Sequence, residues 1–296
     1  MKIKGQTTSV TLGDIYKILG ISAVVGIIIR CIQMAKFIDS ETGFATGGKL
    51  LGVILILLLV ATVLCFLVKA YLTAESEKIQ IQGVKSRPLG AATAFFAASL
   101  FFDFISGLTS MSGADSADFK NLMLTGAMPR FLQSVFALLS ALYFLFLAKD
   151  YFKGTEGASK HRVLATMPVA WAGFRMVCRF VRQISFIKVS DLFLELVMLA
   201  FMLIFFMALA QVISGVYSEG FRWRIPSYGA AAALIAIILS VPRLIFTVIS
   251  FEKFINPQHT FQLADFAFFI FIFVLVKTVC TDINPYTAYD QKNGDE

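Results

Sequence analysis

The sequence predicts an all-α integral membrane protein whose single domain, residues 1–296, crosses the bilayer eight times. Of the 296 residues, 58% are hydrophobic and only 15% are charged, whereas a soluble domain carries roughly 25% charged residues. The apolar residues form long runs, and a bilayer core of about 30 Å needs roughly 20 of them in a helix. Eight runs approach that length, and the connections between them are too short for a soluble ATPase or kinase domain.

The first four spans are predicted at residues 15–37, 50–72, 89–110 and 127–148. The first is too long and too charged for the core of a signal peptide, so we expect it to be a span. The second is an apolar run, LLGVILILLLVATVLCFLV. Pro88 directly precedes the third span and Pro129 lies near the start of the fourth, where a proline is compatible with a helix.

The last four spans are predicted at residues 164–186, 191–216, 227–250 and 263–281. Pro168, Pro226 and Pro285 lie near the ends of these spans. Only Pro242 lies well inside one, where it removes a backbone donor and is expected to kink the helix. Pro242 is therefore a candidate hinge, although many membrane helices contain a proline that only shapes packing.

Lysine and arginine predict the orientation of the chain. Fifteen of these residues lie on the side that holds both termini, and six, including Arg130, lie on the other side. Since basic residues stay on the cytoplasmic side, both termini are predicted to be cytoplasmic. We expect a plasma membrane or bacterial inner membrane. The net charge of +7 is then explained by orientation and by anionic lipid headgroups, and no nucleic acid partner is expected.

The spans also suggest four parallel helix-hairpin repeats, at residues 1–80, 81–155, 156–220 and 221–284. The odd-numbered spans carry a charge about two thirds of the way along, at Arg30, Asp103, Arg179 and Arg243, and the even-numbered spans close with Lys69, Lys149, Gln211 and Lys277. Both series advance by 62 to 80 residues. Chance is the alternative, because small residues and lysines are common in membrane spans.

Composition alternates with the charges and predicts how the spans pack. Small residues open the odd-numbered spans, as in SYGAAAALIA, whereas bulky residues fill the even-numbered ones, as in FAFFIFIFVLV. Small residues let helices approach closely in a membrane. We therefore expect an inner ring of odd-numbered spans and an outer layer of even-numbered spans, related by an axis near the membrane normal.

Charged side chains are predicted to share one layer in the outer half of the membrane. If the odd-numbered spans run outward and the even-numbered spans run inward, the same depth holds Arg30, Asp103, Arg175, Arg179, Arg182, Glu195, Arg243 and Asp265. Arg175, Arg179 and Arg182 are spaced four and three apart, so they share one helix face. Such a face is expected to line the bundle interior or a water-filled cavity.

Two interpretations of this layer compete. In the structural one, Arg30 or Arg179 forms ion pairs with the carboxylates and Arg182 reaches the outer interface. In the functional one, the surplus of arginine binds an anionic or zwitterionic group, because guanidinium holds carboxylate or phosphate in bidentate fashion. The candidate ligand-binding residues are Arg30, Asp103, Arg175, Arg179, Glu195, Arg243 and Asp265.

These features favour a transporter or permease-like protein with a basic, outward-facing cavity for a small anionic or zwitterionic solute. The alternative is a non-transporting receptor, scaffold or membrane subunit that binds a separate protein chain. An intramembrane enzyme is a third hypothesis, and we expect no enzyme because no catalytic motif occurs. The four cysteines and two histidines show no metal-ligand spacing, so neither a metal nor a cofactor is expected.

Overall fold

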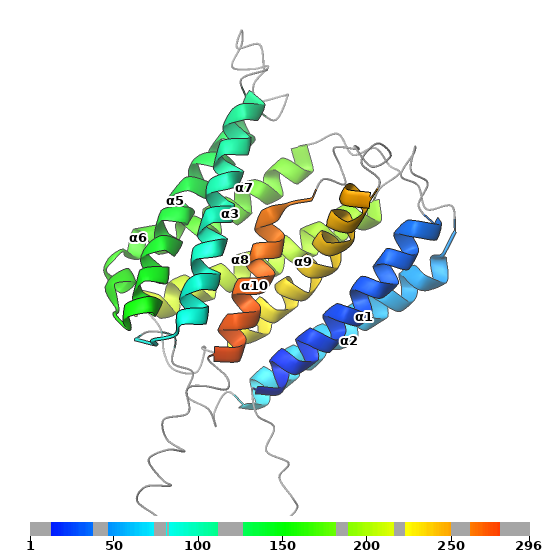
Figure 1. Ribbon diagram of the computed structural model, residues 1–296, viewed down its shortest axis with the longest axis horizontal. Coiled ribbons are helices and arrows are strands. Elements are labelled where there is room, and N and C mark those ends of the chain that lie inside the picture. Colours follow the sequence, from blue (N-terminus) through cyan, green and yellow to red (C-terminus); the bar gives the residue numbers. More distant parts are fainter. Residues whose placement is uncertain are drawn as a thin grey trace, which may run out of the picture.

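The computed structural model describes residues 13–37, 47–73, 81, 83–111, 127–181, 189–215, 223–249 and 261–278, and all regular structure in them is helical. The long helices are α1 (Gly13–Phe37), α2 (Lys49–Thr73), α3 (Arg87–Met111), α5 (Ala127–Lys153), α7 (Met167–Val181), α8 (Val189–Ile213), α9 (Arg224–Ile249) and α10 (Leu263–Lys277). Two short helices, η1 (Gly157–Lys160) and α6 (Arg162–Ala165), lie between α5 and α7 (Figure 1).

The protein is an all-helical integral membrane protein, as its composition predicts. Each long helix coincides with one predicted span, and within the described ranges six of them, α1, α2, α3, α5, α8 and α9, are long and apolar enough to cross a membrane. The described parts of α7 and α10 have 15 residues each, or about 22 Å of helix. The fifth predicted span begins too early, since its first residues belong to α6, which ends at Ala165 before α7 begins.

The long helices pack in the hairpins α1–α2, α3–α5, α7–α8 and α9–α10, and α9 lies at the centre of the bundle. Of the six membrane-crossing helices α9 is the most buried, and it contacts α1, α2, α8 and α10. Its small residues, Gly229 to Ala233, allow these neighbours to approach. Helices α1 and α2 form one edge of the bundle (Figure 1).

The predicted inner ring of odd-numbered spans is wrong. Those spans are α1, α3, α7 and α9, and among their described residues only α1 and α9 form an extensive contact. The even-numbered spans are not an outer layer, because α8 and α10 supply much of the core. Bulky side chains therefore do not mark lipid-facing helices here, and the fourfold repeat stays a prediction.

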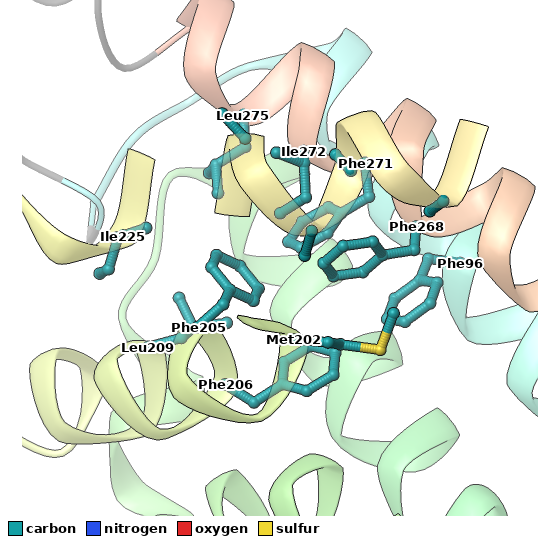
Figure 2. Close-up of a cluster of buried hydrophobic side chains, with 14 of the residues drawn as sticks. Phe96, Met202, Phe205, Phe206, Leu209, Ile225, Phe268, Phe271, Ile272 and Leu275 are labelled. Atoms are coloured by element: carbon teal, nitrogen blue, oxygen red, sulfur yellow. The ribbon is translucent and has the colours of Figure 1, made fainter. Parts of the chain in front are cut away.

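Aromatic rings fill the core between α3, α5, α8 and α10. Phe96 stacks on Phe271 with ring centroids 5.7 Å apart, and it meets Phe144 edge to face at 4.8 Å. Phe205 and Phe268 make a further edge-to-face pair at 5.6 Å. Figure 2 shows the rings of Phe96, Phe205, Phe268 and Phe271 converging. Each such pair adds about 0.5–1.5 kcal/mol of stability beyond that of burial. The aromatic cluster therefore stabilises the helices that carry the polar residues described below.

A glycine fixes the close packing of α3 against α5. A Cβ atom added to Gly107 would overlap Ser134 Oγ and lie 2.9 Å from Ser134 Cβ. We expect Gly107→Ala to lower the free energy of unfolding by about 1–3 kcal/mol, because the two helices must separate. The measurement is SDS-induced unfolding in mixed micelles.

Gly173→Ala on α7 is the matched control, because an added Cβ there meets nothing within 4 Å. That change should be neutral or slightly stabilising. If Gly107→Ala is as stable as Gly173→Ala, the close contact between α3 and α5 is wrong.

Candidate functional site

A polar cavity of about 330 Å³ lies among α3, α5, α7 and the start of α10. Its polar lining includes Asp103, Arg130, Gln133, Arg175, Arg179 and Gln262. Each of these residues lies in the second half of α3 or α7, or at the beginning of α5 or α10. Because the four helices alternate in direction, these positions meet at one end of the bundle (Figure 1).

Arg175 forms a buried, bidentate ion pair with Asp265. Arg175 Nη1 lies 2.7 Å from Asp265 Oδ1, and Nη2 donates to Asp265 Oδ2 at 2.7 Å. Arg175 Nη2 also donates to Gln262 Oε1, and the guanidinium lies 5.4 Å from the centre of the Trp171 ring. Both side chains of the pair are about 95% buried, so Asp265 neutralises the first arginine of α7.

Glu195 bridges two arginines from different helices. Arg179 Nε lies 3.0 Å from Glu195 Oε2, and Arg243 Nη1 lies 2.6 Å from Glu195 Oε1. All three side chains are largely buried. One carboxylate thus holds α7, α8 and α9 together, and the group carries a net charge of +1.

Asp103 has a different environment, because no described arginine lies within ion-pair distance of it, and Arg175 interacts with its charge only at longer range. Its Oδ2 accepts hydrogen bonds from Trp171 Nε1 at 2.9 Å and from Gln133 Nε2 at 3.1 Å. Trp171 itself is fixed by the aromatic core, with ring centroids 6.3 Å from Phe96. Within the described ranges, Asp103 makes no ion pair and its Oδ1 accepts no hydrogen bond.

Arg130 is a cation of the same cavity that, like Asp103, makes no ion pair within the described ranges. It lies in the first turn of α5, half-buried, and its side chain lines the same cavity. Its carbonyl accepts a hydrogen bond from Ser134 Oγ at 2.9 Å, but its guanidinium has no partner in the part of the chain that the structure describes. The cavity therefore contains one cation and one anion that the described protein groups do not pair.

The structure brings together six of the seven predicted ligand-binding residues. Asp103, Arg175 and Arg179 line the cavity, Asp265 and Glu195 bind two of these side chains, and Arg243 is reached through Glu195. These side chains therefore lie near one another, and their common depth in the membrane stays a prediction.

The remaining predictions have mixed outcomes. Arg30 is buried on α1, donates to Gln33 Oε1 at 2.6 Å and does not line the cavity. Pro242 is buried inside α9, which continues unbroken to Ile249. Arg182 lies outside the described residues. The predicted pairing of Arg179 with a carboxylate is confirmed for Glu195, whereas Asp265 pairs with Arg175.

Four residues of the site were not predicted from the sequence: Arg130, Gln133, Trp171 and Gln262. In the sequence, Arg130 is one of the basic residues that predict the orientation of the chain, so its place in the cavity lining is not evident. The available signal is the spacing of Arg130 and Gln133, three residues apart on one helix face at the depth of the charged layer. In the described ranges, no group of three His, Cys, Asp or Glu side chains could hold a metal ion.

No protein-family model, curated protein or solved structure matches this chain. Its function is therefore inferred from the cavity and the charges around it.

Proposed function

We propose that the protein is a multi-pass membrane transporter or permease-like protein that binds a small anionic or zwitterionic solute in the cavity. The observation that carries this proposal is the pair Arg130 and Asp103, whose charged groups face a cavity of about 330 Å³ without an ion-pair partner in the described ranges. Charges at membrane depth are costly, and they are found where a ligand, water or an ion compensates them.

The proposal includes a topology. Helices α7 and α10 complete eight spans, both termini are cytoplasmic, and the cavity opens outward in a plasma membrane or bacterial inner membrane. The excess of basic residues on the side of the termini supports this orientation. Four parallel hairpin repeats are part of the same proposal, supported by the recurrence of charges along the sequence.

The native Cys178 provides a direct test, because it lines the cavity between Arg175 and Arg179. We expect a variant in which the other three cysteines are replaced by serine to react at Cys178 with membrane-impermeant methanethiosulfonates added outside intact cells. The sulfonate reagent should react faster than the trimethylammonium reagent at equal intrinsic reactivity, since the arginines attract an anion. Mass spectrometry of the purified protein measures both rates.

Ala232→Cys in a cysteine-free background is the buried control, because Ala232 is fully buried on α9. Cys178 should react at least about tenfold faster than this control. Equal rates would mean a dry cavity and would refute the transporter proposal.

The second candidate function is a non-transporting receptor, scaffold or membrane subunit of a larger complex. Mutual pairing of buried charges favours it: Arg175 with Asp265, and Glu195 with both Arg179 and Arg243. Such pairs are sufficient to hold a bundle together without a solute. An unreactive Cys178 would favour this candidate.

A further inference from the structure

Arg130 and Asp103, the two cavity charges without an ion-pair partner among the described residues, have opposite signs. This defines the class of solute. Resting on the proposed function, we infer that the solute is a zwitterion, with an ammonium group that binds Asp103 and an anionic group that binds Arg130. A simple anion would leave the Asp103 carboxylate uncompensated beside it, and a simple cation would face the arginines.

Asp103 has the geometry of a cation acceptor. Trp171 Nε1 and Gln133 Nε2 both donate to Oδ2, at 2.9 and 3.1 Å, so the carboxylate is held in one orientation. Its Oδ1 accepts no hydrogen bond from any group in the described ranges. An ionised carboxylate accepts hydrogen bonds through both oxygens, and an ammonium group supplies the missing donors.

Arg130 is placed to bind the other end of the same molecule. It lies one helical turn before Gln133, and residues three apart on a helix have Cβ atoms about 5–6 Å apart. Gln133 in turn contacts Asp103. Gln133 therefore connects the two charged residues, and both of them line one cavity.

The other arginines of the lining are bound to protein carboxylates, and the group of Arg179, Arg243 and Glu195 keeps a net charge of +1. Arg175 is bound by Asp265 and Gln262, and Arg179 is bound to Glu195. Arg130 and Asp103 are thus the open ends of the site. The cavity volume of about 330 Å³ lies at the lower limit of the pockets that bind small molecules, so the zwitterion has the size of an amino acid.

Trp171 is a built-in reporter of binding, because its indole donates to Asp103. The chain has two tryptophans, so Trp223→Phe leaves Trp171 as the only one. The purified variant in lipid nanodiscs is titrated with three pools: zwitterions (alanine, β-alanine, γ-aminobutyrate, taurine), anions (propionate, butyrate, ethanesulfonate) and cations (ethylamine, propylamine). We expect the zwitterion pool to shift the Trp171 emission at concentrations at least about tenfold lower than either other pool.

Substitutions test both ends of the site. Asp103→Asn and Arg130→Gln should each weaken the response to zwitterions at least about tenfold, and Asp103→Asn should improve the response to anions. Arg130→Lys, which keeps the charge, should retain part of the response. Arg87→Gln is the matched control, because Arg87 is exposed at the opposite end of α3 and should respond as the parent does. The comparison of the three solute pools tests the inference even if these variants do not fold, because it requires no substitution in the cavity.

The outcomes separate this inference from the proposed function. If the anion pool binds as well as the zwitterion pool and Asp103→Asn does not weaken it, the zwitterion is refuted while transport of an anion stands. If no pool shifts the emission although Cys178 reacts with impermeant reagents, the zwitterion is again refuted and the cavity is still wet. If Cys178 is unreactive, the proposed function itself fails.

Discussion

Glu195→Gln is expected to lower the free energy of unfolding by about 3–5 kcal/mol, because it leaves two buried arginines without their shared carboxylate. Arg179 and Arg243 reach Glu195 at 3.0 and 2.6 Å from two different helices. The amide keeps the shape of the side chain but loses the negative charge, so the net charge of the group rises from +1 to +2. The measurement is SDS-induced unfolding of the purified protein in mixed micelles.

A second substitution distinguishes lost charge balance from lost packing. Glu195→Gln combined with Arg243→Gln returns the group to a charge of +1, so the double variant should be more stable than the sum of the single effects by about 0.5–3 kcal/mol. Glu156→Gln is the control, because Glu156 is exposed and its change should stay within about 0.5 kcal/mol. Strict additivity of the two substitutions would show that Glu195 and Arg243 do not stabilise each other, despite the 2.6 Å between them.

The sequence predicts the charged layer of this protein but not the partners within it. Depth follows from position along a helix, so Arg179, Glu195 and Asp265 can be assigned to one layer without knowing the order of the helices. Pairing depends on which helices are neighbours and how each is rotated. Packing of α7 on α8 brings Arg179 to Glu195, and Arg175 reaches across to Asp265 on α10. Neither pairing can be read from the local sequence.

For a related reason, composition does not predict which helices face lipid and which face the core. Bulky residues are stable both in lipid and in a core that aromatic rings fill, so the phenylalanines of α8 and α10 do not reveal which way they face. In the structure Phe205 and Phe268 are fully buried. Arg130 is not recognisable as a site residue in the sequence, because a basic residue at the end of a span both orients the chain and can line a site. Only the structure shows that its side chain lines a cavity.

Asp265→Asn is expected to lower the free energy of unfolding by about 3–5 kcal/mol, as Glu195→Gln does, when measured by SDS-induced unfolding in mixed micelles. Arg175 is buried and its two terminal nitrogens lie 2.7 Å from the two oxygens of Asp265, so the substitution leaves a buried cation whose strongest partner is gone. Asp14→Asn is the matched control. The Asp14–Lys69 pair is partly exposed, with 3.4 Å between its charged atoms, and should contribute at most about 1 kcal/mol.

Replacing both members of the buried pair separates stability from function. A buried ion pair exchanged for apolar side chains of similar size is often neutral or stabilising, so Arg175→Met with Asp265→Leu should recover most of the stability that Asp265→Asn loses. The same double variant should lose the response of Trp171 to zwitterions, because Arg175 forms part of the cavity wall and contacts the Trp171 ring. A double variant that is stable and still responds would restrict Arg175 to a structural role. A double variant as unstable as Asp265→Asn would mean that the pair itself holds α7 against α10, since apolar packing could not replace it.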